Sequence, residues 1–196
     1  MFLAGTETST LTIQWAMPLL LSHPKAMHEL RQEIDDNVGH NRLINDFDLS
    51  ELLYLRCVIN ETLRLYPPVP LLLPHFSSQN SIVVRNNVPK GTILLVNAWA
   101  MHRDPKLWDE HEPDKFNLER FQTIQLEKES YKFVSFGIGR RACPGAVPTS
   151  YLVALKILGG LLSCLHVAFQ PWWGAYDAIH DISHSLPCGF SMVSYG

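Results

Sequence analysis

One short segment limits how this sequence can fold more than any other. Residues 136–145 read FGIGRRACPG, so Cys143 lies in a loop with three glycines and two arginines, directly before an apolar stretch. Glycine permits positive φ angles and close backbone approach, while arginines and backbone N–H groups stabilise a thiolate. A thiolate is a good ligand for soft metal ions. The loop therefore predicts a ligand thiolate at Cys143, and the alternative is a buried free cysteine in a glycine-rich turn.

The composition is that of an ordinary globular protein. Of the 196 residues, 46% are hydrophobic and 18% are charged, which is enough for one core. A formal net charge of -3, with scattered basic residues, gives no basis for a nucleic-acid partner. The four cysteines form no C-x-x-C pair, which argues against a zinc site or a disulfide framework and favours a reducing compartment.

Apolar periodicity predicts a mainly helical chain with a small β-sheet, an α+β fold. The predicted helices cover residues 1–21, stopped near Pro18 and Pro24, then residues 24–38 and 55–66. Asp48 and Glu51 resemble a capping box that opens a further short helix.

The second part of the chain is less regular. The runs 81–84 and 92–97 are β-branched and apolar, which predicts a small hairpin or mixed sheet. Asp104 is expected to cap a short helix that ends at Trp108, and a long irregular loop is expected over 109–125. The apolar residues 149–166 predict a buried helix rather than a membrane span, because a lysine and a histidine interrupt the stretch.

The cysteine loop also matches a known pattern. Its positions Phe136, Gly139, Arg141, Cys143 and Gly145 resemble the complete haem-binding signature of the cytochrome P-450 family. The resemblance implies that Cys143 is the proximal iron ligand and that Phe136 packs beside its sulfur. It further implies that Arg141 pairs with a haem propionate. Electron donation from a thiolate ligand to haem iron is known to favour O–O cleavage.

Two segments resemble the E-x-x-R and P-E-R-F motifs of the same family. Glu61 and Arg64 are three residues apart on one predicted helix face, and residues 117–121 read NLERF. The resemblance implies a structural cluster in which Arg120 joins Glu61 and Arg64. Asn117 and Leu118 depart from the motif's usual proline. The alternative for the helix pair alone is a weak surface contact.

Residues 4–9 (AGTETS) resemble the oxygen-activation segment of the family. The resemblance implies that Glu7 and Thr8 are catalytic, because an acid followed by a hydroxyl group on a helix interrupts backbone pairing and delivers protons during oxygen activation. The alternative is a plain helix start in which Thr6 or Thr8 is the cap.

Segments 66–75 and 96–105 are similar to those of plant microsomal members that hydroxylate isoflavonoids and related phenolics. The resemblance implies a substrate pocket and a further propionate contact from His75. The pocket residues so implied are Val69, Leu71, Leu72 and Leu73. The alternative is that these apolar residues join a core.

The resemblance implies that residues 1–170 are the C-terminal half of a cytochrome P-450 domain, while 171–196 form a divergent tail without family likeness. The cofactor would be haem b, with electrons from NADPH through a reductase. Full-length members are anchored on the cytosolic face of the endoplasmic reticulum membrane, and no anchor or signal is recognised in this sequence. In the tail, the i,i+4 pair His180 and His184 is expected to be unrelated to metal binding.

The expected activity is insertion of one oxygen atom from dioxygen into a small organic substrate, a plant phenolic or isoflavonoid. A haem-thiolate isomerase or dehydratase that needs no reductase is an alternative, against which the pair Glu7 and Thr8 argues. The other alternative is a truncated, catalytically inactive remnant that cannot retain haem.

Overall fold

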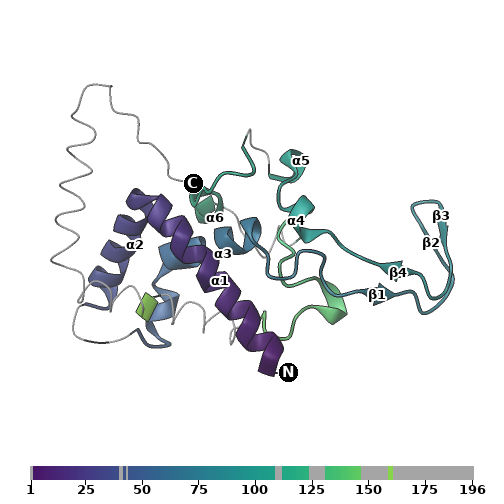
Figure 1. Ribbon diagram of the computed structural model, residues 1–196, viewed down its shortest axis with the longest axis horizontal. Coiled ribbons are helices and arrows are strands. Elements are labelled where there is room, and N and C mark those ends of the chain that lie inside the picture. The colour runs from purple at the N-terminus through teal and green to yellow at the C-terminus, as the bar shows by residue number, and fades with distance from the viewer. Residues whose placement is uncertain are drawn as a thin grey trace, which may run out of the picture.

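The structure is a computed structural model that describes residues 2–39, 42, 44–108, 112–123, 131–146 and 159–160. Three long helices form its body, and a thin arm of short strands projects from it (Figure 1). The helices are α1 (Phe2–Ser22), α2 (Pro24–Asn37), η1 (Asp48–Ser50), α3 (Leu53–Leu65), α4 (Ala98–Met101), α5 (Pro105–Trp108), α6 (Glu119–Thr123) and η2 (Gly139–Arg141). The strands are β1 (His75–Phe76), β2 (Ser81–Val83), β3 (Asn86–Val88) and β4 (Ile93–Leu94). The predicted helix-rich α+β class is confirmed.

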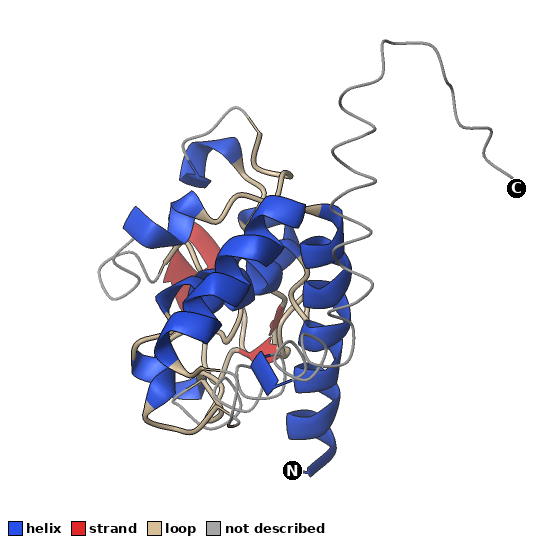
Figure 2. Ribbon diagram, turned by 90° about the vertical axis from the view of Figure 1, so that its left-hand side faces the viewer, coloured by secondary structure: helices blue, strands red, loops and turns tan. Residues whose placement is uncertain are grey.

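The core lies where α1, α2 and α3 pack against one another. Leu20 from α1, Leu30 from α2 and Ile59 from α3 are completely buried, and α6 contacts α3 on the other side of the core. Figure 2 shows α1 running along the whole helical body, with its first turns reaching past the other helices. The core therefore holds the C-terminal part of α1, and most of residues 5–11 are exposed.

Pro18 does not stop α1, contrary to the expectation from the sequence. The helix continues through it to Ser22 and ends only before Pro24. Proline removes one backbone donor from a helix. Here the residues on either side of it, Ala16 and Leu20, are fully buried against the other helices. Tertiary packing thus outweighs the local preference.

The predicted small β-structure is present as two antiparallel strand pairs. β2 pairs antiparallel with β3, and β4 pairs antiparallel with β1. The two residues between β2 and β3, Val84 and Arg85, both have positive φ angles of 47° and 66°. Such a pair of angles forms the tight two-residue turn of a β-hairpin. This turn brings β3 back beside β2, while the run 92–97 supplies β4, which pairs with β1.

The predicted capping box at Asp48 and Glu51 is also wrong. The Asp48 carboxylate instead accepts two hydrogen bonds from the Arg42 guanidinium, at 2.6 and 2.8 Å, and one from the backbone of Asn45. The Arg42 guanidinium lowers the pKa of Asp48 to about 2. Asn45 provides the local turn, because its side-chain oxygen accepts the backbone N–H groups of Phe47 and Asp48.

The short helix α5 and its cap are confirmed, since the backbone N–H of Lys106 donates to the Asp104 carboxylate at 2.9 Å. The predicted helix over 149–166, apart from residues 159–160, and the tail 171–196 lie outside the described residues. None of the helices in the described part of the chain combines the length and apolar character that crossing a bilayer requires.

A side chain of α2 caps the N-terminus of α3. The Glu33 carboxylate accepts the backbone N–H groups of Tyr54 and Leu55 at 2.6 and 2.9 Å. These groups belong to the first turn of the helix and have no partner within it. One carboxylate therefore satisfies two donors and joins two helices.

We expect Glu33→Ala to lower the free energy of unfolding by about 1–2 kcal/mol, because the first turn of α3 loses both acceptors. Urea denaturation measures the change. Asp36→Ala is the matched control on an exposed part of the same helix and is expected to change stability by less than about 0.5 kcal/mol. Equal losses in the two variants would contradict the capping role.

Candidate functional site

The Cys143 loop is closed by backbone hydrogen bonds. The N–H of Cys143 donates to the carbonyl oxygen of Phe136 at 2.8 Å, and the N–H of Ala142 donates to that of Gly139 at 3.1 Å. The side chain of Phe136 is half-buried against the hydrophobic core. Cys143 itself is exposed. The loop thus fixes the backbone of Cys143 and leaves its thiol accessible, unlike a free cysteine buried in a turn.

Two glycines give this loop its shape. Gly137 and Gly139 have φ angles of +69° and +78°, which L side chains rarely adopt. A Cβ atom added at Gly139 would meet no atom within 4 Å, so its φ angle rather than crowding requires glycine. The nearby Arg141 is exposed, and Gly145 is half-buried. The surface around the thiol is therefore open, with a guanidinium close by in sequence.

The structure brings Glu61, Arg64 and Arg120 together. Arg64 is fully buried and donates to both carboxylate oxygens of Glu61, each at 2.7 Å. The Nε atom of Arg120 lies 3.6 Å from the same carboxylate. The alternative of a weak surface pair is wrong, because α3 turns this face toward the core.

The remaining donors of the cluster bind backbone oxygens of irregular segments. Arg64 Nη1 donates to the carbonyl oxygens of His102 and Pro113, and Nη2 donates to that of Lys115. Arg120 Nη2 donates to the carbonyl oxygens of Glu112 and Lys115. These bonds hold the segment around 112–117 against α3, where little regular structure is present to hold it.

The Glu61 carboxylate is the negative group that both arginines of this cluster approach. Burial raises its pKa, while the hydrogen bonds from Arg64 and from the backbone N–H of Asn117 act against that rise. The Asn117 N–H donates to Glu61 Oε1 at 2.9 Å, and Leu118 stands where the P-E-R-F motif has proline. The segment that carries Arg120 is therefore also attached to Glu61 through its backbone.

Glu7 and Thr8 lie inside α1, because the helix already begins at Phe2. The proposed alternative, a cap at Thr6 or Thr8, is therefore wrong. Glu7 is exposed and Thr8 is half-buried. The hydroxyl groups of Thr10 and Thr12 donate to the carbonyl oxygens of Thr6 and Thr8 at 2.8 and 2.9 Å. The backbone carbonyls around Glu7 thus receive additional donors.

The residues expected to line a substrate pocket form a turn between α3 and β1. Leu72 has a φ angle of +50°, and its N–H donates to the carbonyl oxygen of Val69. Leu71 and Leu73 are 48% and 73% exposed, and His75 in β1 is half-buried. Two of these apolar side chains therefore face outward, which contradicts the alternative that the segment simply joins a core.

His102 is the residue that sequence reasoning missed. It is fully buried at the C-terminal end of α4. Its Nδ1 atom lies 3.1 Å from the carbonyl oxygen of Arg64, and the N–H of Val134 donates to its Nε2 atom at 3.0 Å. Burial lowers its pKa to about 4. The only signal in the sequence is a histidine in an otherwise apolar run, which is more often a core residue than a functional one.

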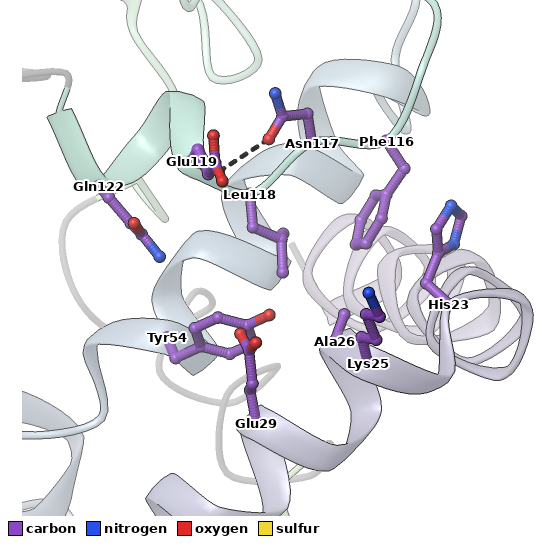
Figure 3. Close-up of a pocket in the computed structure, with 10 residues that line it drawn as sticks. All are labelled: His23, Lys25, Ala26, Glu29, Tyr54, Phe116, Asn117, Leu118, Glu119 and Gln122. Atoms are coloured by element: carbon purple, nitrogen blue, oxygen red, sulfur yellow. Dashed lines mark hydrogen bonds between the residues drawn. The ribbon is translucent and has the colours of Figure 1, made fainter.

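A hollow of about 420 Å³ lies elsewhere, between α2, the start of α3 and the segment before α6 (Figure 3). Its lining mixes charges of both signs with apolar side chains, among them Lys25, Glu29, Phe116 and Leu118. Asn117 accepts a hydrogen bond there from the backbone of Glu119. None of the residues expected to bind a cofactor or substrate lines this hollow.

Comparison with known proteins gives one consistent family. A sequence model of the family described as cytochrome P-450 matches residues 1–147. Isoflavone 3'-hydroxylase of Medicago truncatula is 47% identical over 164 residues, which are 84% of this chain and 32% of that protein. The (+)-piperitol/(+)-sesamin synthase CYP81Q2 of Sesamum radiatum is 49% identical over 164 residues, which are 84% and 31% of the two chains. The chain spans about a third of the length of these relatives.

The fold agrees with this assignment. A zebra fish cytochrome P-450 solved with progesterone superposes with a TM-score of 0.69 and is 37% identical. The match covers 82% of this chain and 35% of the zebra fish chain. The predicted resemblance to the family is thereby confirmed.

We expect Arg64→Leu to destabilise the protein by about 3–5 kcal/mol, because it leaves the buried Glu61 carboxylate without its principal partner. Arg42→Leu is the matched control, since Arg42 also binds a carboxylate through two nitrogen atoms but is exposed, and it should destabilise the protein far less. Urea denaturation compares the variants. Similar losses for both would contradict the special role of the buried pair.

The pKa of His102 predicts a pH-dependent stability. The group is neutral in the folded protein down to about pH 4 but takes up a proton near pH 6.5 when unfolded. The stabilisation is therefore present above pH 6.5 and is lost as pH falls toward 4, by up to about 3 kcal/mol. The charges of Arg64 and Arg103 act in the same direction as burial.

The difference in free energy of unfolding between the wild type and His102→Gln, measured from pH 7 to pH 4, checks this prediction. Glutamine does not titrate, so the pH-dependent part should be smaller in the variant by that amount. Parallel profiles for the two proteins would contradict the lowered pKa.

Proposed function

Because the chain belongs to the cytochrome P-450 family, we propose that it is part of a haem-thiolate monooxygenase that inserts one oxygen atom from dioxygen into a small organic substrate. The observation that carries the proposal is the Cys143 loop, in which a backbone hydrogen bond and two positive-φ glycines present an accessible thiol. The isoflavone hydroxylase relative supports a plant phenolic or isoflavonoid as the substrate class.

The donor set around Cys143 fits haem b. In the described part of the chain, no three His, Cys, Asp or Glu side chains converge as a metal site would require. A single protein thiolate suits a metal whose other ligands come from a macrocycle, and the open space at Gly139 leaves room for a flat group. Phe136, Arg141, Gly145 and His75 are the further residues that we propose for haem contact.

When bound, haem supplies the redox chemistry that activates dioxygen. The protein's own contribution begins with Cys143, whose sulfur donates to the metal. Glu7 and Thr8 are proposed to move protons, since the Glu7 carboxyl group is exposed on α1 and the neighbouring carbonyls already accept hydroxyl donors. The buried cluster of Glu61, Arg64 and Arg120 is proposed to be structural, because its groups bind one another and backbone oxygens.

Val69, Leu71, Leu72 and Leu73 are proposed to line the substrate pocket. Their partly exposed apolar side chains are suited to an apolar ring system. Electrons would come from NADPH through a reductase, and the full-length protein would act at the endoplasmic reticulum membrane. The proposed division after residue 170 places the tail 171–196 outside the catalytic domain. A truncated remnant that retains these motifs but not haem is the alternative.

Haem uptake tests the proposal. We expect the chain expressed with haem, reduced and treated with carbon monoxide, to give a strongly red-shifted Soret band that is lost in Cys143→Ala. Cys57→Ala is the matched control, because Cys57 is the buried free cysteine of α3 and should leave the band in place. Adding an isoflavone to the oxidised protein should then perturb its Soret absorption.

Three results would count against the proposal in different ways. No haem uptake by the wild type would favour the inactive remnant. A band that persists in Cys143→Ala would exclude this sulfur as the ligand. A band that is lost equally in Cys57→Ala would indicate general unfolding of the loop rather than loss of a ligand.

A further inference from the structure

The two hydrogen bonds of the His102 ring define its tautomer. The backbone N–H of Val134 can only donate, so Nε2 must be the acceptor and carry no proton. A neutral ring then has its proton on Nδ1, which donates to the carbonyl oxygen of Arg64. The ring therefore bridges the last turn of α3 and the segment that leads into the Cys143 loop, with one donor and one acceptor in fixed positions.

His102 is also held through its backbone. Its carbonyl oxygen accepts Arg64 Nη1 at 2.7 Å, so His102 and Arg64 are joined in both directions. The Phe133 ring stacks on the imidazole at 5.6 Å between centroids. Next to Val134, the hydroxyl of Ser135 donates to the carbonyl oxygen of Leu63. Residues 133–135 are thus held by contacts to α3 and to His102, and the His102 ring accepts the hydrogen bond of the Val134 amide.

A continuous set of backbone bonds leads from this point to the cysteine. The carbonyl oxygen of Val134, whose N–H binds His102, accepts the N–H of Gly137 at 2.8 Å. The carbonyl oxygen of Phe136 accepts the N–H of Cys143 at 2.8 Å. A shift of Val134 would therefore move the residues on which the Cys143 backbone rests.

We propose that His102 is a positioning residue for Cys143: its neutral, Nδ1-protonated ring transmits the fixed geometry of the Glu61–Arg64 pair to the thiolate loop. The haem readout of this proposal rests on the proposed function, whereas its readouts in the haem-free protein do not. The ring acts through Val134 and makes no contact with the cofactor or substrate in this role.

The first test uses the unmodified protein without haem. The ¹⁵N chemical shifts of the His102 imidazole should show a protonated Nδ1 and an unprotonated Nε2. The opposite tautomer, or a doubly protonated ring at neutral pH, would overturn the proposal, because Val134 would then face a donor.

The second test compares amide hydrogen exchange in two substitutions. His102→Leu keeps an apolar side chain but loses both hydrogen bonds, and it should speed exchange at Val134 and Cys143 by up to about tenfold relative to Ile59 in the core. His102→Gln retains one donor and one acceptor and should restore most of the protection. Phe133→Leu removes the ring stack but keeps both bonds, and should leave the ratio near the wild-type value.

Each result decides the question. Faster exchange confined to the loop in the leucine variant, with recovery in the glutamine variant, supports the proposal. Equal acceleration at Ile59, or no change at Cys143, overturns it. If the leucine variant does not fold, the glutamine variant and the tautomer measurement decide the question. The proposal is also overturned if Phe133→Leu loses the protection of the Val134 amide while His102→Gln keeps it.

The haem-loaded protein gives an independent readout. In the reduced carbon monoxide complex, His102→Leu should convert part of the red-shifted Soret band to the shorter-wavelength form of a haem without thiolate ligation, and His102→Gln should restore it. An unchanged band in His102→Leu would overturn the proposal. If the wild type binds no haem, the proposed function fails while the tautomer and the exchange ratios still test His102.

Discussion

Burial of the Arg64 guanidinium is the constraint on which the rest of this structure depends. A guanidinium has five N–H donors and never loses its charge in a protein, so a fully buried one needs five acceptors. The structure supplies five hydrogen bonds, to the two carboxylate oxygens of Glu61 and to the carbonyl oxygens of His102, Pro113 and Lys115. Three of these acceptors belong to segments far from α3 in sequence, so satisfying one side chain determines where those segments lie.

This constraint explains how segments with little regular structure keep their positions. Between α5 and η2 the described chain has only the short helix α6, and few backbone ladders can hold it. Side chains of α3, α4 and α6 take over that role, with Arg64 and Arg120 binding carbonyl oxygens and His102 binding a backbone N–H. Since the loop of Cys143 follows directly, the cluster and the thiol are parts of one connected arrangement.

The sequence predicted what local patterns determine. Apolar periodicity located the long helices, and the glycines of the 136–145 segment indicated that positive φ angles were possible there, which the structure shows at 137 and 139. The i,i+3 spacing indicated that Glu61 and Arg64 share a helix face, although it gave no information about burial. The resemblance to a known family supplied the third member, Arg120, because no local pattern joins residues more than fifty positions apart.

Features that depend on distant partners were not predictable. β2 pairs with β3 through a tight turn of Val84 and Arg85, two residues that rarely adopt positive φ angles, and β4 pairs with β1. Asp48 binds Arg42 instead of capping a helix, and the cap of α3 comes from Glu33 on another helix. His102 gave no sign of its role, since its two partners become neighbours only after α3 and the 131–146 segment have packed.

Buried and exposed residues divide the candidate site into two parts with different requirements. Glu61, Arg64 and His102 are fully buried, so the described chain satisfies their hydrogen bonds by itself. Glu7, Cys143 and the apolar side chains of Leu71 and Leu73 are exposed. Exposed apolar side chains that gather in one segment commonly mark a binding surface. The backbone geometry of the thiol loop is therefore set by hydrogen bonds among the described residues, whereas the exposed apolar side chains are open to a ligand or to further protein contacts.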